Sequence, residues 1–344
     1  MAPRSFLHLL TLCGFLSAAS VHAVVPSSTA DSRRILTVLT YDSLMAEGGL
    51  GPELVSRFEK GCECRVKVQV VGDAAQMVSR LQLERVRARS ETQVVVGVDQ
   101  MLWPQVRSMA LRWTAEGKFE HEVEPGFTPL DYGILGWIWN PDWKGFSGGV
   151  AEAPSKWSDL LYPKWLRLLL LQDPRTSSPG LGFVIGARVA QGASAPAFFR
   201  ELRRQWMTLP AGWSGSYEIF LLGGAPLVWS YTTSQAYHLS RDPKSRLRAV
   251  VFDEGNPLQI EGAFIVEAAV RDPESLALAR RFVGFLASRE IQELIPSRQW
   301  MLPALKGVSL PREFLEVPAP KKLLVPSSDL DLRAILKEWE LWIR

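Results

Sequence analysis

A repeating strand–helix pattern over the first hundred residues constrains the fold of this chain more than any other feature. Three short runs have the character of β-strands and are bounded by turn residues: residues 35–40, 64–71 and 93–98. Helices are predicted between them, one with Pro52 in its first turn and Gly61 at its end, and one over residues 74–87. Strands that alternate with helices predict a parallel sheet with right-handed crossovers. The sequence therefore favours an α/β fold.

A second α/β unit is predicted to follow the first. Residues 129–139 form a long apolar run that carries the chain towards it, and Ser155 is predicted to cap a short helix over residues 156–161. A buried strand is predicted over residues 168–171. The remaining predictions are helices over residues 196–206, 273–288 and 329–344, and strands over residues 225–231, 246–252 and 258–268.

The length of 344 residues favours two lobes rather than one. The predicted division is a first lobe over residues 24–139, a second lobe over 140–254, a return to the first lobe over 255–300, and a C-terminal helical segment over 301–344.

The first 23 residues have the pattern of a secretory signal peptide. Arg4 precedes an apolar run over residues 6–18, and small residues before Ala23 predict cleavage there. Cys13 lies inside the apolar run, so a lipid tether is less favoured than simple export. No other apolar run reaches about 18 residues, so the mature protein is expected to be soluble.

Charge and cysteine content exclude several classes of function. The formal net charge is only +3, and the basic residues are spread among acidic ones, which argues against nucleic-acid binding. The histidines fit no metal spacing, and no metal or cofactor is expected. Cys62 and Cys64 can close a disulfide in an oxidising compartment, but the ring would be small and would stabilise little. Whether they pair is left open.

Polar residues collect at the predicted strand ends. Tyr41, Asp42, Asp73 and Asp99 all follow strands, and in open α/β sheets ligands bind outside the carboxyl ends of the strands. Three carboxylates and a phenol at one edge would suit a cationic ligand. For any single Asp the alternative of a turn or cap residue is favoured.

Two later stretches offer complementary chemistry. Ser177 or Ser178, followed by Pro179, predicts a capped helix whose N-terminus can hold a phosphate, carboxylate or hydroxyl group, although a plain capped helix explains the same pattern. Residues 212–214 and 229–238 place aromatic rings and hydroxyls beside glycine turns. Such a set suits a flat cationic molecule, and the alternative is an ordinary aromatic core.

The motifs together resemble the thiamine-binding periplasmic proteins, which are the solute receptors of bacterial thiamine ABC importers and have the two-lobed type II periplasmic-binding fold. The resemblance rests on blocks that run in order along the mature chain: residues 41–43, 62–64, 97–99, 131–133, 172–182, 212–214 and 230–238, with Trp300-Met301 before Pro303. It implies two lobes, each a mostly parallel sheet flanked by helices, that close over one ligand in the cleft between them.

The resemblance also implies a set of ligand-binding residues: Tyr41, Asp73, Ala74, Ser177, Ser178, Trp213, Tyr231, Thr232, Thr233, Ser234, Gln235, Tyr237 and Trp300. Asp73 and Ala74 would meet the aminopyrimidine, and Tyr41 and Tyr237 would flank the rings. The two serines would face the phosphate or hydroxyethyl end. Gly48 departs from the family pattern, which has Trp in this turn, so one aromatic wall is expected to be missing or replaced.

The resemblance implies a monomeric, periplasmic receptor without enzymatic activity, with thiamine as ligand and an ABC permease as partner. One alternative is a receptor of the same fold for ferric iron or a polyamine. A less favoured alternative is a thiaminase-like enzyme, which would need a cysteine nucleophile with an activating base. Cys62 and Cys64 lie far from the aromatic blocks in sequence, and no such base is apparent beside them.

Overall fold

Two long strands, β4 (Thr128–Trp139) and β9 (Asn256–Ile265), form the centre of an eleven-stranded sheet in the computed structural model. The structure describes residues 34–121, 124–146, 152–325 and 330–344. The predicted signal peptide lies outside these residues. The strand order is β2-β1-β3-β9-β4-β7-β5-β6, and the short strands β8, β10 and β11 pair with β4 or β9 beside this path.

The predicted parallel strands near the start of the chain are confirmed. β1 (Ile35–Tyr41) pairs in parallel with both β2 (Arg65–Val71) and β3 (Val94–Asp99). The long strands differ from the expected parallel pattern, because β9 runs antiparallel to both β3 and β4. The sheet is therefore mixed, with its antiparallel pairs at the centre.

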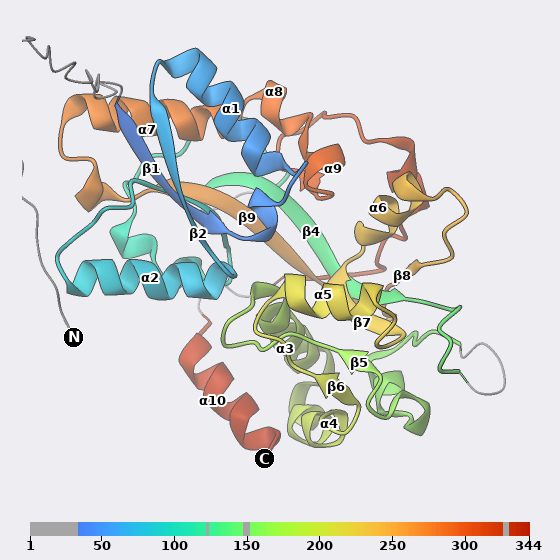
Figure 1. The fold of residues 1–344 in the computed structure, drawn as a ribbon. Coiled ribbons are helices and arrows are strands. Elements are labelled where there is room, and N and C mark those ends of the chain that lie inside the picture. The colour runs from blue at the N-terminus through green and yellow to red at the C-terminus, as the bar shows by residue number, and fades with distance from the viewer. Residues whose placement is uncertain (1–33, 122–123, 147–151, 326–329) are drawn as a thin grey trace, which may run out of the picture. The chain divides into compact units, whose positions relative to one another are not determined.

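Helices cover both faces of this part of the sheet (Figure 1). α1 (Leu50–Cys62) and α7 (Pro273–Leu286) lie on one face, and α2 (Ala74–Val86) lies on the other. Phe58 of α1 meets Phe282 of α7 edge to face at 4.8 Å between ring centroids. The predicted stop of α1 at Gly61 is wrong by one residue: the helix ends at Cys62, and Glu63 takes the left-handed conformation with φ 54°.

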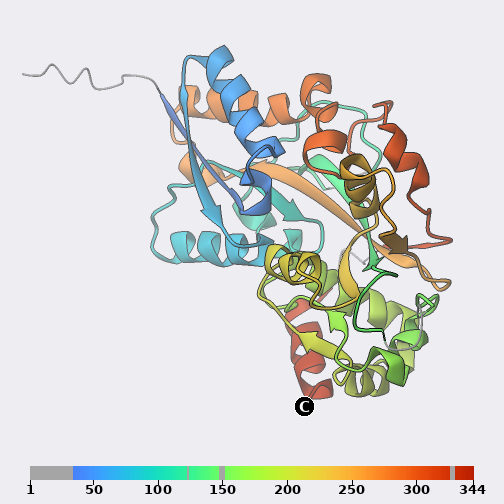
Figure 2. The ribbon, with the colours of Figure 1, turned by 45° about the vertical axis from the view of Figure 1, so that its right-hand side comes forward.

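The second half of the sheet consists of β7 (Leu227–Tyr231), β5 (Leu169–Leu170), β6 (Trp206–Thr208) and β8 (Arg248–Val250). It is covered by α3 (Ser178–Gln191), α4 (Ala195–Leu202) and α5 (Trp213–Leu221), as Figures 1 and 2 show. Its core is aromatic, with Trp229 packed edge to face against Phe183 at 5.0 Å and against Trp137 at 5.5 Å.

Two predicted helices in this half need correction. Residues Trp157–Leu161 form a 3-10 helix with Lys156, not Ser155, at its N-cap, because the side chain of Asp159 accepts hydrogen bonds from the backbone of both residues. The helix predicted over residues 196–206 ends at Leu202, and Trp206 begins β6 instead.

The remaining elements are α6 (Ser234–Arg241), α8 (Arg289–Gln292), α9 (Ile295–Arg298), α10 (Leu332–Trp342), β10 (Leu302–Pro303) and β11 (Leu323–Leu324). The C-terminal helix α10 packs on α4, where Trp342 stacks on Phe199 at 5.6 Å. Its Trp339 stacks on Trp206 at 6.2 Å. Among the described residues no helix combines the length and apolarity that crossing a membrane requires.

Candidate ligand-binding site

A cavity of about 580 Å³ opens between the carboxyl end of β1, the N-termini of α2, α3 and α5, and the segment from α9 to β10. Cavities of this size hold ligands of the mass of a vitamin or a nucleoside. Nine of the residues expected at the site line it: Tyr41, Asp73, Ala74, Ser178, Trp213, Tyr231, Ser234, Tyr237 and Trp300. Residues from both halves of the sheet therefore meet at one cavity.

Four expected residues lie behind the cavity wall. Ser177, Thr232 and Thr233 are at most 1% exposed and do not line the cavity. Gln235 is held by the backbone on both sides, since its amide nitrogen donates to the carbonyl of Glu316 and its amide oxygen accepts from Ala249 N at 2.7 Å. Thr232 and Thr233 lie in the turn from β7 into α6, and Gln235 lies in the first turn of α6; a linear motif does not reveal how this turn packs.

Asp73 joins the N-termini of three helices. Its Oδ1 accepts from Ala74 N of α2 at 2.7 Å and from Ser178 N of α3 at 3.4 Å, and its Oδ2 accepts from Trp213 N of α5 at 3.3 Å. Helix N-termini favour negative charge, so the carboxylate is stabilised there. Burial nevertheless raises the pKa of Asp73, and the hydrogen bonds to Ala74 and its other donors only oppose this shift.

Glu261 of β9 is a cavity residue that the motifs did not identify. Its Oε2 accepts from the hydroxyl of Tyr41 at 2.7 Å, and its Oε1 accepts from the hydroxyl of Tyr231 at 3.2 Å and from Gln259 Nε2 at 3.0 Å. Gln299 Nε2 in turn donates to the hydroxyl of Tyr41 at 2.7 Å. The signal in the sequence was an acidic residue inside an apolar strand, since a buried charge is costly unless it is paired or hydrogen-bonded.

Two further carboxylates flank Glu261 in the sheet. In the strand register Asp99 of β3 and Asp131 of β4 are its direct neighbours on either side. Burial raises the pKa of Asp99 to about 6 and that of Glu261 to about 7, and burial together with the charge of Glu261 raises the pKa of Asp131 well above its usual value. Neither carboxylate oxygen of Asp131 has a hydrogen-bond partner within the described part of the chain.

Aromatic rings also line the cavity. Trp213 stacks on Tyr217 at 4.7 Å between centroids, and its Nε1 donates to Ser230 Oγ at 2.8 Å. Tyr237 meets Trp300 edge to face at 5.4 Å. Trp300 has φ 59°, an unfavourable conformation for a residue with a bulky side chain. The fold thus holds a bulky aromatic residue in a strained backbone conformation at the cavity wall.

Gly48 also lines the cavity, with φ +73° and no atom within 4 Å of the position that a Cβ would take. A positive φ of this kind favours glycine over any residue with a side chain. The backbone carbonyl of Gly48 accepts from Arg298 Nη1 at 3.3 Å. Open space rather than an aromatic ring therefore stands at this position.

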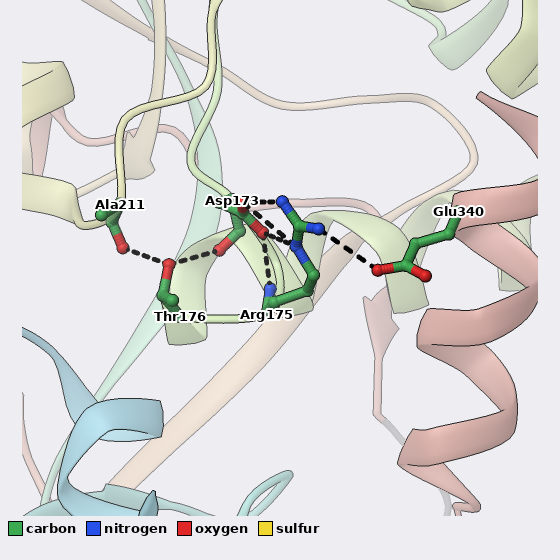
Figure 3. Close-up of polar contacts among 5 residues, drawn as sticks. All are labelled: Asp173, Arg175, Thr176, Ala211 and Glu340. Atoms are coloured by element: carbon green, nitrogen blue, oxygen red, sulfur yellow. Dashed lines mark hydrogen bonds and ion pairs between the residues drawn. The ribbon is translucent and has the colours of Figure 1, made fainter. Parts of the chain in front are cut away.

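The segment that leads into α3 is fixed by ion pairs (Figure 3). Arg175 donates to both oxygens of Asp173 and reaches Glu340 of α10 at 3.2 Å, and Thr176 Oγ1 donates to the carbonyl of Ala211 at 2.6 Å. The predicted start of α3 is confirmed, with Ser177 at the N-cap and Pro179 in the first turn, but neither serine hydroxyl makes a capping hydrogen bond within the described part of the chain. Ser177 instead lies close enough to Asp73 to lower the pKa of that carboxyl, against the larger effect of burial.

The two cysteines that remain after the predicted leader form a disulfide bond, Cys62–Cys64, with 5.1 Å between their Cα atoms. Neither lines the cavity. A bonded cysteine has no free thiolate to act as a nucleophile, which removes the basis for a thiaminase-like reaction. Among the described residues no cluster of three or more His, Cys, Asp or Glu has the geometry of a metal site.

Comparison with known proteins identifies the class that this fold and cavity define. Residues 85–330 match the model of the family described as bacterial extracellular solute-binding protein, and the chain belongs to this family. It is a family of binding proteins rather than enzymes.

The most similar relatives include the thiamine-binding periplasmic protein of Brucella abortus, 32% identical over 98% of this chain and 97% of the relative. The thiamine-binding periplasmic protein of Escherichia coli K12 is 33% identical over 90% of this chain and 93% of the relative. A solved periplasmic thiamin binding protein superposes with a TM-score of 0.81 at 30% identity, over 91% of this chain and 97% of that one. A ferric ion-binding protein of Pasteurella haemolytica shares the fold, with a TM-score of 0.67 at 15% identity over 90% of this chain and 95% of that one.

Proposed function

We propose that this protein binds thiamine, and thiamine phosphates, in the cavity and delivers the ligand to the permease of an ABC importer. The observation that carries the proposal is the pairing of an aromatic wall, formed around Trp213 and Trp300, with the buried carboxylate of Glu261. Thiamine has a flat aminopyrimidine, a permanently charged thiazolium and a polar tail, and these groups are complementary to such a wall. The similarity to thiamine-binding periplasmic proteins supports the same ligand.

The orientation of the ligand follows from the charges around the cavity. The thiazolium would lie against the aromatic rings, where a desolvated cation–π contact contributes about 2 kcal/mol. The aminopyrimidine would meet Asp73, whose carboxylate can accept a hydrogen bond from the exocyclic amine. The phosphate or hydroxyethyl end would face Ser178, because a helix N-terminus attracts an anion and not a cation.

Delivery to a permease would require the cavity to open and close. We propose that the parts of the chain over residues 24–139 and 255–300 form one lobe, that residues 140–254 form the other, and that they close over the ligand as a monomer. Asp73 supports this division, since its hydrogen bonds join α2 of the first part to α3 and α5 of the second.

Titration calorimetry with thiamine, its monophosphate, its diphosphate, spermidine and ferric citrate tests the ligand. We expect tight binding of one or more thiamine forms at one site per chain, with no comparable heat from spermidine or iron. Binding of spermidine or iron without any thiamine form would establish a different solute receptor of the same fold. The mass of any small molecule that is released when the purified protein is denatured provides an independent check.

A further inference from the structure

Glu261 belongs to a row of three buried carboxylates, and the proposed function does not explain why two more stand behind it. Asp99, Glu261 and Asp131 are neighbours in the register of β3, β9 and β4, and their side chains are 0%, 6% and 0% exposed. Glu261 lines the cavity, and the other two lie behind it. Three acidic groups in contact with little water repel one another strongly, because the surrounding medium screens them poorly.

Glu261 is held in place without being neutralised. Its hydrogen-bond donors are the hydroxyls of Tyr41 and Tyr231 and the amide of Gln259, all of them uncharged. Gln259 lines the same cavity, and its Oε1 is buried and lacks a hydrogen-bond partner among the described residues. A carboxylate fixed by neutral donors next to an unpartnered acceptor presents a site for a positively charged group.

The charged and titratable groups that act on Glu261 come from several elements. Asp99 faces it from β3, Asp131 from β4 and Asp73 from the N-terminus of α2, while the two tyrosines come from β1 and β7. Arg241 and Arg298 also line the cavity, but Arg298 donates to Gly48 and Arg241 lies over the ring of Tyr237 at 5.5 Å. Arg298 therefore contacts the turn that contains Gly48, and Arg241 contacts Tyr237 of α6, rather than the carboxylate row.

We propose that Glu261 is the counter-ion that selects a cationic ligand, and that the Asp99–Glu261–Asp131 row exchanges a proton for that cation when the ligand binds. The inference rests on the proposed function, because it assigns the thiazolium of thiamine as the cation. When the cavity is empty the row keeps protons that compensate for its mutual repulsion. When thiamine binds, the permanent positive charge of its thiazolium compensates for the repulsion instead. Glu261 then loses its carboxyl proton to solvent.

The raised pKa of Glu261, about 7, sets the size of the effect that can be measured. At pH 7 such a group holds about half a proton when the cavity is empty, and an adjacent cation lowers its pKa and releases that fraction. At pH 9 the group is ionised in both states, so no proton leaves. Release of a proton should therefore be present near neutral pH and absent at alkaline pH.

Calorimetry of thiamine binding at pH 7 and pH 9, in two buffers with different ionisation enthalpies, measures the number of protons released. We expect up to about half a proton per ligand from Glu261 at pH 7 and none at pH 9. In Glu261→Gln this release should disappear and the affinity for thiamine should fall at least tenfold. Thiochrome, a flat uncharged oxidation product of thiamine, should lose less than about twofold. The aminopyrimidine titrates in both proteins, so the difference between them isolates Glu261.

Asp131→Asn is the matched variant, because it removes a buried carboxylate of the same row that does not line the cavity. Loss of this carboxylate should lower the pKa of Glu261, so that proton release at pH 7 shrinks, while thiamine affinity should change much less than in Glu261→Gln. If Asp131→Asn weakens binding as much as Glu261→Gln does, the row acts only by supporting the fold and the inference is wrong.

The outcomes separate this inference from the proposed function. A wild-type protein that binds no thiamine form contradicts the proposed function itself. A wild-type protein that binds thiamine without buffer-dependent heat at pH 7, or a folded Glu261→Gln variant with unchanged affinity, contradicts the inference alone. If Glu261→Gln does not fold, the wild-type proton count and the Asp131→Asn variant still decide.

Discussion

Asp73 has two tasks at once, since one carboxylate satisfies backbone N–H groups at three helix starts and also lines the cavity. Groups at helix N-termini have no partner within their own helix, so an external acceptor is worth about 1 kcal/mol or more. A ligand that donates a hydrogen bond to Asp73 would therefore meet a carboxylate that is already fixed in position, and it would lose little entropy in ordering it.

Asp73→Asn is expected to weaken thiamine binding at least tenfold, or about 1.4 kcal/mol. The amide must turn an N–H₂ group towards one of the backbone donors at Ser178 or Trp213, and it has no charge to attract the aminopyrimidine. Fluorescence or calorimetric titration measures the affinity. Asp42→Asn serves as control, because Asp42 lines the cavity and its carboxylate accepts a hydrogen bond from Ser214 Oγ at 2.9 Å. Equal losses in both variants would show that Asp73 has no special role.

Trp213→Ala is likewise expected to lower thiamine affinity at least tenfold, since it removes a ring face from the cavity and the stacking partner of Tyr217. Trp143→Ala is the matched control, because this half-buried tryptophan does not line the cavity. Near-normal affinity in Trp213→Ala would mean that the ligand binds elsewhere.

At the level of elements, the sequence predicted the order of strands and helices well and the pairing of strands within the sheet less well. The β1–α1–β2–α2–β3 order was readable because apolar periodicity and turn residues are local signals. The antiparallel pairing of β4 and β9 was not, because nothing within either strand states which partner it meets across more than a hundred residues. Glu261 was missed for the same reason: its neighbours Asp99 and Asp131 become neighbours only through that pairing.

The cavity residues also divide into those that local sequence signals identify and those that depend on how distant segments pack. Tyr41, Asp73 and Trp213 end strands or begin helices, and such positions can be predicted from sequence to lie at the edge of a sheet. Thr232 and Gln235 belong to the same motif as Tyr231 but turn behind the wall, because the direction of a side chain depends on how α6 packs.

Helix α10 is expected to stabilise the protein without forming the site. Trp339 is 2% exposed and stacks on Trp206, so Trp339→Ala should lower the free energy of unfolding by about 3 to 5 kcal/mol. Leu341→Ala on the same helix removes a side chain from a residue that is 56% exposed and should change it by less than about 0.5 kcal/mol. Urea denaturation of both variants checks this, and equal stabilities would mean that α10 does not pack as described.

At the scale of the whole molecule, the buried carboxylates make stability depend on pH. Burial raises the pKa values of Asp99, Asp131 and Glu261, so between about pH 4 and pH 7 the folded protein holds more protons than the unfolded chain. The free energy of unfolding therefore falls as the pH rises through this window. Burial lowers the pKa of His238 to about 4, which acts in the opposite direction below pH 6.5, but it is one group, whereas burial raises the pKa of the three carboxyls of the row and also that of Asp73.

The ligand-free protein is thus expected to be more stable at pH 5.5 than at pH 8. Urea denaturation at several pH values measures the trend, and Asp131→Asn should flatten it because one of the repelling groups is gone. A free energy of unfolding that rises steadily from pH 5.5 to pH 8 would contradict the conclusion that burial disfavours the charged forms of these three carboxyls.

The placement of the tryptophans has a practical consequence. The chain has thirteen of them, and among the described residues only Trp213 and Trp300 line the cavity, while others such as Trp137, Trp157 and Trp229 are fully buried in the core. The emission of an indole changes when a charged ring stacks on it, whereas sealed indoles are insensitive to such an event. A change in tryptophan emission on ligand binding would therefore come from Trp213 and Trp300, while the emission of the buried tryptophans stays constant.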